Sequence, residues 1–296
     1  MPKIILPATS ANLGCGFDCM GMALGIYNEI EFEKRESGLT IELEPHDMGR
    51  ISIRENNLIY RTAKSIVEQR GQKMPGLWMR QKNNIPITRG LGSSAACTVG
   101  GILMADILLG GKLTMQEKME TAARMEGHPD NVVPVFLGGI TITFWAGGTL
   151  KHFKITPPKG LMAALMVPDF SLSTKAARAL LPRKVRMDDA VGNIGRAAML
   201  CAKLASGNTQ DIASCFDDRL HQPYRKGMVV GYDEIIEASY ALGARGAYLS
   251  GAGPSIVALV ANGEEFAAKM VERLKKIEGG WSVRTAEICS EGAKVG

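Results

Sequence analysis

Two stretches of the chain alternate apolar and polar residues, 28–33 (N-E-I-E-F-E) and 140–145 (I-T-I-T-F-W). Alternation with a period of two is typical of a strand that buries one face and exposes the other. A shorter apolar segment at 3–7 precedes a glycine-containing turn. These three segments predict strands in the first half of the chain.

Helices are predicted between these strands. Residues 58–70 have the helical spacing of apolar positions and are followed by glycine, and Thr114 with Glu117 forms the pattern of a capping box. The helix that the box opens is expected to run to about Glu126, before a glycine and a proline. The apolar stretch 95–111 contains a Gly-Gly pair and an aspartate, which predicts a buried helix and not a membrane span.

The second half alternates strands with helices joined by short connections, which is typical of an α+β fold. The predicted strands are 162–167, 247–249, 256–260 and 282–288, and the predicted helices are 174–181, a long helix ending near 207, 232–242 and 264–277. Between the halves, 145–160 is rich in glycine and proline and shows no clear long element. We therefore place a domain boundary near residue 155, which gives domains 1–155 and 156–296.

Composition narrows the possible functions. The 296 residues are 46% hydrophobic and 22% charged, with 35 Lys and Arg against 30 Asp and Glu, an ordinary globular composition. The basic residues are scattered, so we expect small anionic ligands and no nucleic-acid or membrane partner. The six cysteines form no CxxC pair and no zinc-type spacing, and the first residues lack a signal-peptide pattern. These features predict reduced thiols and a cytoplasmic protein.

The richest candidate site is a glycine-rich segment that leads into the apolar helix. It consists of Pro86, Ile87, Thr88, Arg89, Gly90, Leu91, Gly92, Ser93, Ser94, Ala95 and Ala96. Glycines let backbone amides approach a ligand, a helix N-terminus attracts phosphate, and the serine hydroxyls could bind phosphate or a metal. The pattern also fits a dinucleotide loop, but its polar, proline-broken approach and the lack of a well-placed acid count against that, and no Walker A lysine follows. A simple helix cap is the structural alternative.

Three further segments bring polar or small residues together at the ends of predicted elements. They are 12–18 (N-L-G-C-G-F-D), 126–131 (E-G-H-P-D-N) and 250–255 (S-G-A-G-P-S). Taken singly, the first and the last could be tight turns, and the histidine of the second could be a structural residue.

Taken together and in this order, the four segments resemble the GHMP family of small-molecule kinases, and the resemblance runs from residue 3 to about 290. It implies a two-domain α+β fold, with an N-terminal domain like the second domain of ribosomal protein S5, a C-terminal ferredoxin-like α/β domain, and the active site between them. It also implies ATP bound by 86–96, adenine near Asn57 and Leu58, and Mg²⁺ held by the oxygens of Ser94 and Glu126. Such kinases are often homodimers.

The acceptor substrate is indicated by the same resemblance. Within the family, the 12–18 and 126–131 segments look like those of enzymes that phosphorylate the side-chain hydroxyl of L-homoserine to O-phospho-L-homoserine, in threonine biosynthesis. The substrate-binding positions then fall on Asn12, Asp18, His128, Asn131, Arg178 and Arg225. A carboxylate such as Asp18 suits the α-ammonium group, and an arginine fork suits the α-carboxylate.

The catalytic residues implied are Asn12, Asn131, Ser94 and Glu126. Several GHMP relatives carry an aspartate that can act as base where this chain has Asn131, and the adjacent Asp130 is expected to point elsewhere. Phosphoryl transfer depends mainly on positioning and on stabilising charge. We therefore hypothesise catalysis without a general base, in which loop amides and Mg²⁺ stabilise the phosphoryl group and the two asparagines align the hydroxyl.

Three other functions stay open at this point: a GHMP kinase for an alcohol without an amino-acid head, a nonenzymatic relative that senses its ligand, and a nicotinamide-dependent oxidoreductase. The chain also departs from the family pattern at Cys15, where proline is usual, with Cys19 four residues later. These two thiols are either idle or a redox switch, and a switch requires a lowered thiol pKa.

Overall fold

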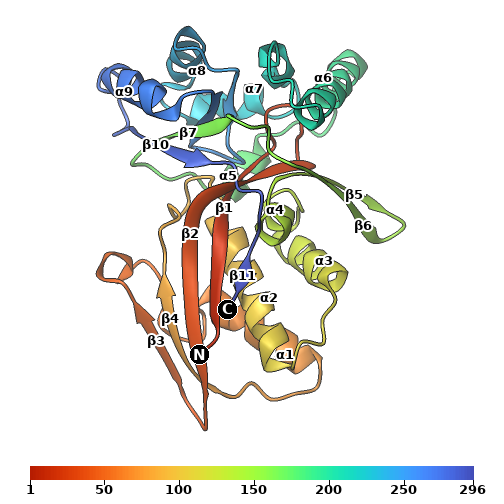
Figure 1. Ribbon diagram of the computed structural model, residues 1–296, viewed down its shortest axis with the longest axis vertical. Helices are drawn as coiled ribbons and strands as arrows, with labels where there is room; N and C mark the ends of the chain where they lie inside the picture. Colours follow the sequence, from red (N-terminus) through yellow and green to blue (C-terminus); the bar gives the residue numbers. More distant parts are fainter.

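The alternating residues 28–33 belong to a 16-residue strand, β2 (Met20–Arg35), at the centre of the first sheet. The computed structural model describes residues 1–296 and contains seven strands in this sheet. They are β1 (Lys3–Ala11), β2, β3 (Leu39–Leu43), β4 (Gly76–Lys82), β5 (Ile140–Ala146), β6 (Thr149–Ile155) and β11 (Lys294–Val295). The order is β11-β1-β2-β4-β3, with β5 pairing with β2 and β6, and only β3 and β4 are parallel. The long β2 therefore connects both wings of the sheet (Figure 1).

Four helices pack beside this sheet, with α2 in the middle of them (Figure 1). They are α1 (Leu58–Gln69), α2 (Ser93–Leu108), α3 (Met115–Glu126) and α4 (Val132–Leu137). The burial of α2 confirms the prediction for 95–111. Its aspartate, Asp106, is neutralised inside the packing by Lys118 Nζ at 2.7 Å. A Cβ on Gly101 would lie 2.6 Å from the Ile59 carbonyl oxygen, so this glycine allows α1 and α2 to approach closely.

The second sheet has four antiparallel strands in the order β10-β7-β9-β8. They are β7 (Met162–Val167), β8 (Gly246–Leu249), β9 (Ile256–Val260) and β10 (Ser282–Glu287). The accompanying helices are α5 (Thr174–Ala179), α6 (Met187–Ala205), α7 (Gln222–Arg225), α8 (Tyr232–Ala241) and α9 (Gly263–Leu274), with short 3₁₀ helices at Ala213–Phe216 and Lys226–Met228. A further 3₁₀ helix, Pro45–Asp47, follows β3 of the first sheet. The predicted strands 162–167 and 256–260 appear with these bounds.

The region around the expected boundary differs from the prediction. Residues 145–160 were expected to lack a long element, but β6 occupies 149–155 and forms a hairpin with β5 through a Gly-Gly turn. Four of its seven residues are exposed in succession, so β6 gives no alternating pattern. The chain then enters the second sheet with β7, and its last residues return to the first sheet as β11.

The buried apolar side chains form one large core and one small core. The large cluster contains 54 residues and reaches from the first sheet to Leu165 and Val257 of the second. The small cluster contains 13 residues, between the second sheet and α8 and α9. Packing thus continues across the junction of the two sheets. None of the helices is both long enough and apolar enough to cross a membrane.

Candidate active site

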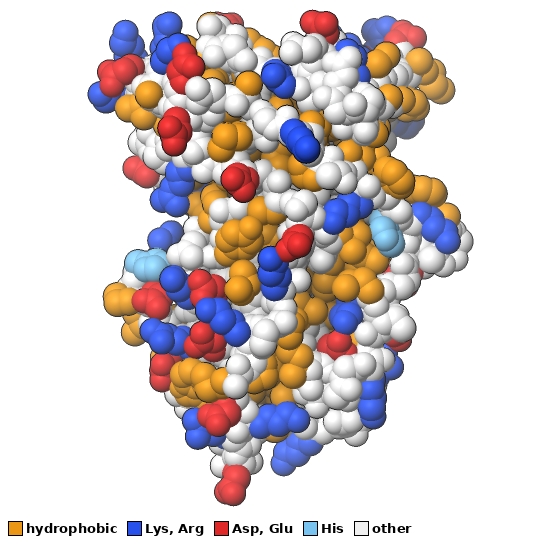
Figure 2. All heavy atoms as spheres, in the orientation of Figure 1, with side chains coloured by type: hydrophobic (Ala, Val, Ile, Leu, Met, Phe, Trp, Pro, Cys, Tyr) orange, Lys and Arg blue, Asp and Glu red, His pale blue; other side chains and the backbone are white.

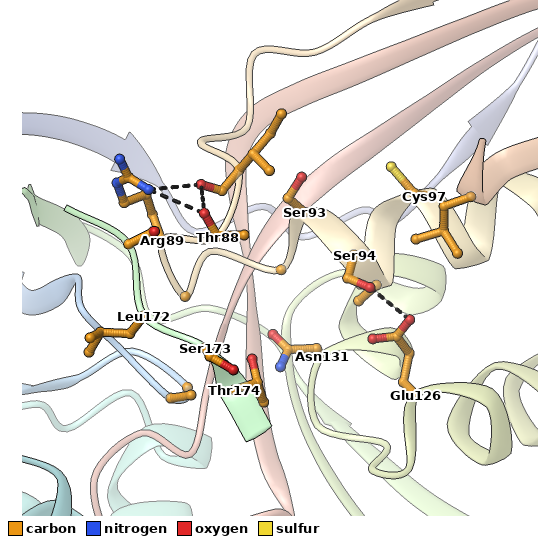
Figure 3. Close-up of a pocket in the computed structure, with 18 of the residues that line it drawn as sticks. Thr88, Arg89, Ser93, Ser94, Cys97, Glu126, Asn131, Leu172, Ser173 and Thr174 are labelled. Atoms are coloured by element: carbon orange, nitrogen blue, oxygen red, sulfur yellow. Dashed lines mark hydrogen bonds between the residues drawn. The ribbon is translucent and has the colours of Figure 1, made fainter. Parts of the chain in front are cut away.

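A cavity of about 860 Å³ lies where residues of the two parts of the molecule meet. Its wall contains most of the residues predicted from the sequence: Asn12, Asp18, Asn57, Leu58, Ile87, Thr88, Arg89, Gly90, Gly92, Ser93, Ser94, Ala95, Glu126, His128, Asn131, Arg178 and Arg225. Figure 3 shows Thr88 and Arg89 of the glycine-rich loop and Leu172, Ser173 and Thr174 of the second part on this one cavity. The four segments singled out in the sequence, 12–18, 86–96, 126–131 and 250–255, therefore all contribute residues to one cavity.

The glycine-rich loop lies against β1 and ends at the N-terminus of α2. Gly90 and Gly92 have φ of 75° and 71°, a left-handed conformation that favours glycine. A Cβ on Gly92 would collide with the Thr9 hydroxyl, and one on Gly90 with the Ser250 carbonyl. The first intrahelical bond of α2 is donated by the Ala96 amide, so the amides before it are available to a ligand. The loop has the construction of a phosphate-binding site.

Three residues predicted for this loop lie outside the cavity wall: Pro86, Leu91 and Ala96. Leu91 and Ala96 are 1% and 0% exposed because they anchor the loop in the core. Their side chains therefore cannot contact a ligand, and they affect ligand binding only through the conformation of the loop backbone.

The side chains of the two residues expected to hold a metal, Ser94 and Glu126, are in contact. Ser94 Oγ donates to Glu126 Oε1 at 3.0 Å, and Thr98 Oγ1 donates to the same oxygen at 2.6 Å; Figure 3 shows Ser94 and Glu126 turned toward one another. Glu126 is the last residue of α3, which the predicted capping box opens and Gly127 ends. No group of three His, Cys, Asp or Glu side chains could hold a metal ion. The oxygen ligands suit Mg²⁺ that also binds phosphate and water, its usual arrangement at nucleotide sites.

Asp18 and Arg178, expected to bind opposite ends of a substrate, are bonded to each other. Arg178 Nη1 and Nη2 each donate to one Asp18 oxygen at 2.9 Å. The hydrogen bond to Asp18 raises the pKa of Arg178. The side chain of Asn12 is also engaged, since its Nδ2 donates to the Gly251 carbonyl and its Oδ1 accepts from the Asp18 amide. Asn12 therefore fixes the shape of the 12–18 loop.

Arg225 is a buried cation without a carboxylate partner. It is 2% exposed, and none of the ion pairs in the chain includes it. Its Nη1 donates to the Gly251 carbonyl at 3.2 Å and its Nε to the Ala177 carbonyl at 3.4 Å, while Nη2 has no bond. Burial, and next the charge of Arg178, lowers the pKa of Arg225. An unneutralised guanidinium at a cavity wall is suited to bind an anion.

The 126–131 segment forms a second charged pair in the cavity wall. His128 Nδ1 lies 2.6 Å from Asp130 Oδ1. Burial alone would lower the pKa of His128, but its bond to Asp130 and the charge of Asp130 outweigh burial and raise it. The expectation that Asp130 points elsewhere is therefore wrong, because the histidine draws its carboxylate into the wall. Asn131 Oδ1 accepts from the Thr9 hydroxyl at 2.8 Å.

Comparison with known proteins agrees with this geometry. The family model described as "GHMP kinases N terminal domain" matches residues 57–139, and "GHMP kinases C terminal" matches residues 200–276. The homoserine kinase of Caldicellulosiruptor bescii is 44% identical, with 100% of this chain and 97% of that protein covered. The chain belongs to the GHMP kinase family.

Solved structures of GHMP kinases show the same fold. The crystal structure of homoserine kinase from Cytophaga hutchinsonii has a TM-score of 0.88 at 30% identity and covers 99% of this chain and 96% of that one. Mevalonate kinase of L. major in complex with R-mevalonate has a TM-score of 0.73 at 16% identity, with 97% and 96% covered. The two-domain α+β prediction is confirmed, and membership of a kinase family removes the nicotinamide-dependent alternative.

Sequence reasoning missed a buried histidine behind the 12–18 loop. His221 is 0% exposed, and its Nε2 lies 2.8 Å from the Gly14 carbonyl. A carbonyl only accepts, so Nε2 carries the proton and Nδ1 accepts from Arg225 Nη1 at 3.3 Å. The ring also stacks on Phe17 at 5.1 Å. His221 thereby links the 12–18 loop to the free guanidinium.

A buried amide network at the expected adenine end was missed as well. Asn57 Oδ1 accepts from the first amides of α1, and its Nδ2 donates to Gln81 Oε1 at 3.1 Å. Gln81 Nε2 donates to Asn83 Oδ1 at 2.7 Å, and Asn83 Nδ2 donates to Asp47 at 2.8 Å. At one end of this network the backbone amides of α1 can only donate, and at the other end the carboxylate of Asp47 can only accept. Both ends therefore require the same orientation of the side-chain amides between them, with each oxygen accepting and each nitrogen donating. The hydrogen bonds thus fix the orientation of the three side-chain amides in this wall of the cavity.

The cysteines give no support to a redox switch. Cys15 is 4% exposed, and burial raises its pKa to about 12. Burial likewise raises the pKa of Cys19 to about 11. All six cysteines are free. Thiols that are buried and protonated react slowly, which favours the idle interpretation.

Proposed function

We propose that this GHMP kinase transfers the γ-phosphoryl group of ATP to the side-chain hydroxyl of L-homoserine, making O-phospho-L-homoserine for threonine biosynthesis. The homoserine kinases at 44% and 30% identity, both covered almost completely, support this assignment. The observation in the site that carries it is the set of three charges at one end of the cavity, in which Asp18 and Arg178 are paired and Arg225 is unpaired.

A zwitterionic substrate fits these charges without leaving one unsatisfied. The substrate's charged groups replace the Asp18–Arg178 ion pair: the α-ammonium group pairs with Asp18, and the α-carboxylate pairs with Arg178 and Arg225. A sugar offers no charge to replace the ion pair. Mevalonate offers a carboxylate to the arginines but leaves Asp18 without a cation. Because an unpaired charge in a partly buried site is costly, the amino-acid head is favoured.

The nucleotide is assigned to the opposite end of the cavity. Backbone amides at Gly90, Gly92 and the start of α2 bind the ATP phosphates, and the base lies near Asn57 and Leu58. Ser94 and Glu126 would hold Mg²⁺, which when bound neutralises charge on the phosphates. The adjacency of these two side chains at 3.0 Å supports that role.

Catalysis in this proposal uses no dedicated base. The Asp130 carboxylate is 2% exposed and bonded to His128, so it is a poor acceptor for the substrate proton. Asn131 and the loop held by Asn12 align the hydroxyl, which attacks the γ-phosphorus; the bond to the ADP oxygen breaks, and the hydroxyl proton leaves to a phosphoryl oxygen or to water. We expect Asp130→Asn to keep turnover within about tenfold. A loss of a thousandfold or more with substrate binding intact would contradict this mechanism.

The remaining parts of the proposal are the domain division at residue 155, a homodimer and a cytoplasmic location. The change from the first sheet to the second after Ile155 supports the division. Six free cysteines are in line with a reducing compartment.

The function is tested by ADP release from Mg-ATP with L-homoserine, D-homoserine, L-serine, L-threonine, mevalonate and galactose. Strong preference for L-homoserine is expected. Turnover with mevalonate or galactose instead would support a kinase activity and contradict the proposed contacts to an amino-acid substrate. No turnover with any of them would favour the alternative of a ligand-binding sensor.

A further inference from the structure

The ring of Phe17 is packed among three polar side chains at the end of the cavity assigned to the acceptor substrate. The guanidinium carbon of Arg225 lies 5.2 Å from the centre of this ring, and that of Arg178 lies 5.7 Å from it. The imidazole of His221 is stacked on the ring, with 5.1 Å between the ring centres and 22° between the planes. One apolar side chain therefore lies against both arginines that are proposed to bind the substrate carboxylate.

The two guanidinium groups beside the ring repel each other, and only one of them has an acidic partner. Arg178 is paired with Asp18, whereas the pKa of Arg225 is lowered by burial and then by the charge of Arg178. The face of an aromatic ring carries partial negative charge and attracts a cation within about 6 Å, most strongly where water is excluded. Arg225 is 2% exposed. The ring therefore offers Arg225 the negative face that no carboxylate of the chain supplies.

The surroundings of Phe17 differ from those of the surface cations. In Figure 2, basic and acidic side chains are mixed over the face shown, so positive charge there has acidic side chains nearby. A second cation–π contact of the chain is of this surface type, because Arg124, which lies over the Trp145 ring, is also paired with Glu120 at 3.2 Å. Arg225 has a ring beside it and no acid. For Arg225, the contact with Phe17 takes the place of an ion pair instead of adding to one.

Backbone bonds hold Phe17 in place without help from either arginine. The residue before it, Gly16, donates its amide to the Asn12 carbonyl at 2.8 Å and accepts from the Met20 amide at 2.9 Å. The residue after it, Asp18, donates its amide to Asn12 Oδ1 at 3.0 Å. The loop thus presents the ring as a fixed support against which the two guanidinium groups rest.

This support matters most when a substrate exchanges the partners of the charged groups. Under the proposed function, the substrate separates Asp18 from Arg178, so Arg178 loses the two bonds that hold it in the empty site. Phe17 is a neighbour that both arginines keep. An aromatic face attracts a guanidinium without using its N–H groups, which stay free to donate to a carboxylate.

We propose that Phe17 is a positioning residue of the acceptor site, whose ring face holds Arg178 and Arg225 near one another so that both can bind one carboxylate. Both arginines lie in the cavity wall and Phe17 does not, so the ring acts through the arginines. The identity of the ligand rests on the proposed function, but the contacts between the ring and the arginines can be tested without it.

Phe17→Leu and Phe17→Tyr separate the ring from its apolar volume. Phe17→Leu keeps an apolar side chain but has no ring, and it should raise KM for L-homoserine about tenfold while KM for ATP stays unchanged. Phe17→Tyr keeps the ring and should stay close to the wild type. Steady-state kinetics with each substrate varied measure the effect. Equal homoserine KM values for Phe17→Leu and the wild type would contradict the proposal.

Fluorinated phenylalanines at position 17 test the ring face at nearly constant shape, and they remain usable if Phe17→Leu fails to fold. Each fluorine withdraws charge from the ring face and weakens its attraction for a cation. KM for L-homoserine should rise stepwise with one, two and three fluorines, to about tenfold with three. The same trifluorinated residue at Phe266, a 3% exposed position in the small core, is the matched control and should change neither KM. A homoserine KM that does not follow the number of fluorines, or an equal rise in KM for ATP, would reject a role in holding the arginines.

Thermal unfolding of the unliganded protein tests the contacts separately from the kinase assignment. Trifluorination at position 17 should lower the melting temperature of the wild type by about 2 °C more than that of Arg225→Met, because part of the loss requires the cation. Equal shifts in the two backgrounds would show that the ring does not stabilise Arg225 and would overturn the proposal. A wild type that shows the difference but does not turn over L-homoserine would contradict the kinase assignment alone.

Discussion

Asp18 and Arg225 differ in the partners that the folded chain gives them. Asp18 is held by two bonds from Arg178, whereas Arg225 is buried beside carbonyls, a histidine and an aromatic ring with no carboxylate. Backbone carbonyls orient a guanidinium but do not neutralise it. The positive charge of Arg225 is therefore not neutralised by an ion pair within the chain.

Arg225→Met tests whether this unpaired charge binds the carboxylate of the substrate. Under the proposed function, KM for L-homoserine should rise at least about thirtyfold while KM for ATP stays unchanged, because a carboxylate loses a buried charge-assisted bond. Thermal stability should not fall, since an unpaired buried charge is removed. Arg80→Met, an exposed position in the first sheet, is the control. Steady-state kinetics with each substrate varied measure the effect, and an unchanged homoserine KM would remove Arg225 from the carboxylate site.

The His128–Asp130 pair makes stability depend on pH. The bond and charge of Asp130 raise the pKa of His128 above its ordinary value, near 6.5 in an unfolded chain. The pair therefore stabilises the fold fully below about pH 6.5, and its contribution is lost as the pH rises through the raised pKa.

Urea unfolding of wild type and Asp130→Asn over a pH series measures this contribution. The difference in free energy of unfolding should be largest at acid pH and should shrink toward alkaline pH. Asp217→Asn, at an exposed pair with Arg196 and Arg219, is the control and should show little pH dependence. A difference that grows toward alkaline pH would mean that the pair is not a histidinium with a carboxylate.

At the scale of elements, the loop before α2 depends on two glycines with positive φ. Gly92 combines a left-handed backbone with contact to Thr9 on β1, so both its conformation and its lack of a side chain are needed. Gly111, after the same helix, has a similar φ of 74° but open space where a Cβ would be. The two positions separate backbone strain from a steric clash.

Gly92→Ala should displace the loop and raise KM for ATP at least about tenfold, with a loss of about 1–3 kcal/mol in stability. Gly111→Ala should cost about 1 kcal/mol from strain alone and leave KM for ATP unchanged. Thermal unfolding and ATP-dependent kinetics on both variants provide the comparison. Equal KM values for the two variants would show that the clash with Thr9 does not move the loop.

Elements with one buried face were predictable from the sequence, and elements without one were not. The strand at 28–33 alternates because one side contacts the core. The strand at 140–145 is present as predicted, but it buries Thr141 and Thr143 and exposes Phe144 and Trp145, so its alternation does not mark its buried side. In contrast, β6 exposes four residues in succession, and α4 is six apolar residues with a proline, too short for a helical period. The four candidate segments of the site were found because glycine and polar residues mark them within a few positions. The Asp18–Arg178 pair and the bonds of His221 join residues 160 and 207 positions apart, and local patterns carry no such distances.

The last residues of the chain pair with the first strand of the first sheet. After β10 the chain returns along the first sheet, where the Ala293 amide donates to the Val135 carbonyl and β11 pairs with β1. Lys3 and Gly296 exchange both of their backbone bonds. These contacts protect the edge of β1.

Deleting residues 290–296 should therefore lower the melting temperature by about 5–10 °C, from the loss of several backbone hydrogen bonds and of an edge strand. Differential scanning calorimetry measures the effect. Appending a short Gly-Ser segment after Gly296 is the control, and it should cost less because the pairing of Lys294 and Val295 is kept. A truncated chain as stable as the wild type would mean that β11 contributes nothing to the fold.

This return means that the polypeptide passes between the two sheets twice. The outgoing segment 156–161 and the returning segment 287–291 line one cavity of about 510 Å³, so they lie close together. A single connecting segment would allow the parts built on the two sheets to rotate relative to one another about it. Two neighbouring segments resist that rotation and allow only bending in one plane. Any change in the width of the active-site cleft then occurs without twist. Under the proposed function, the angle between a phosphoryl donor on the first part and an acceptor held partly by the second would thereby be preserved if the gap between them narrowed.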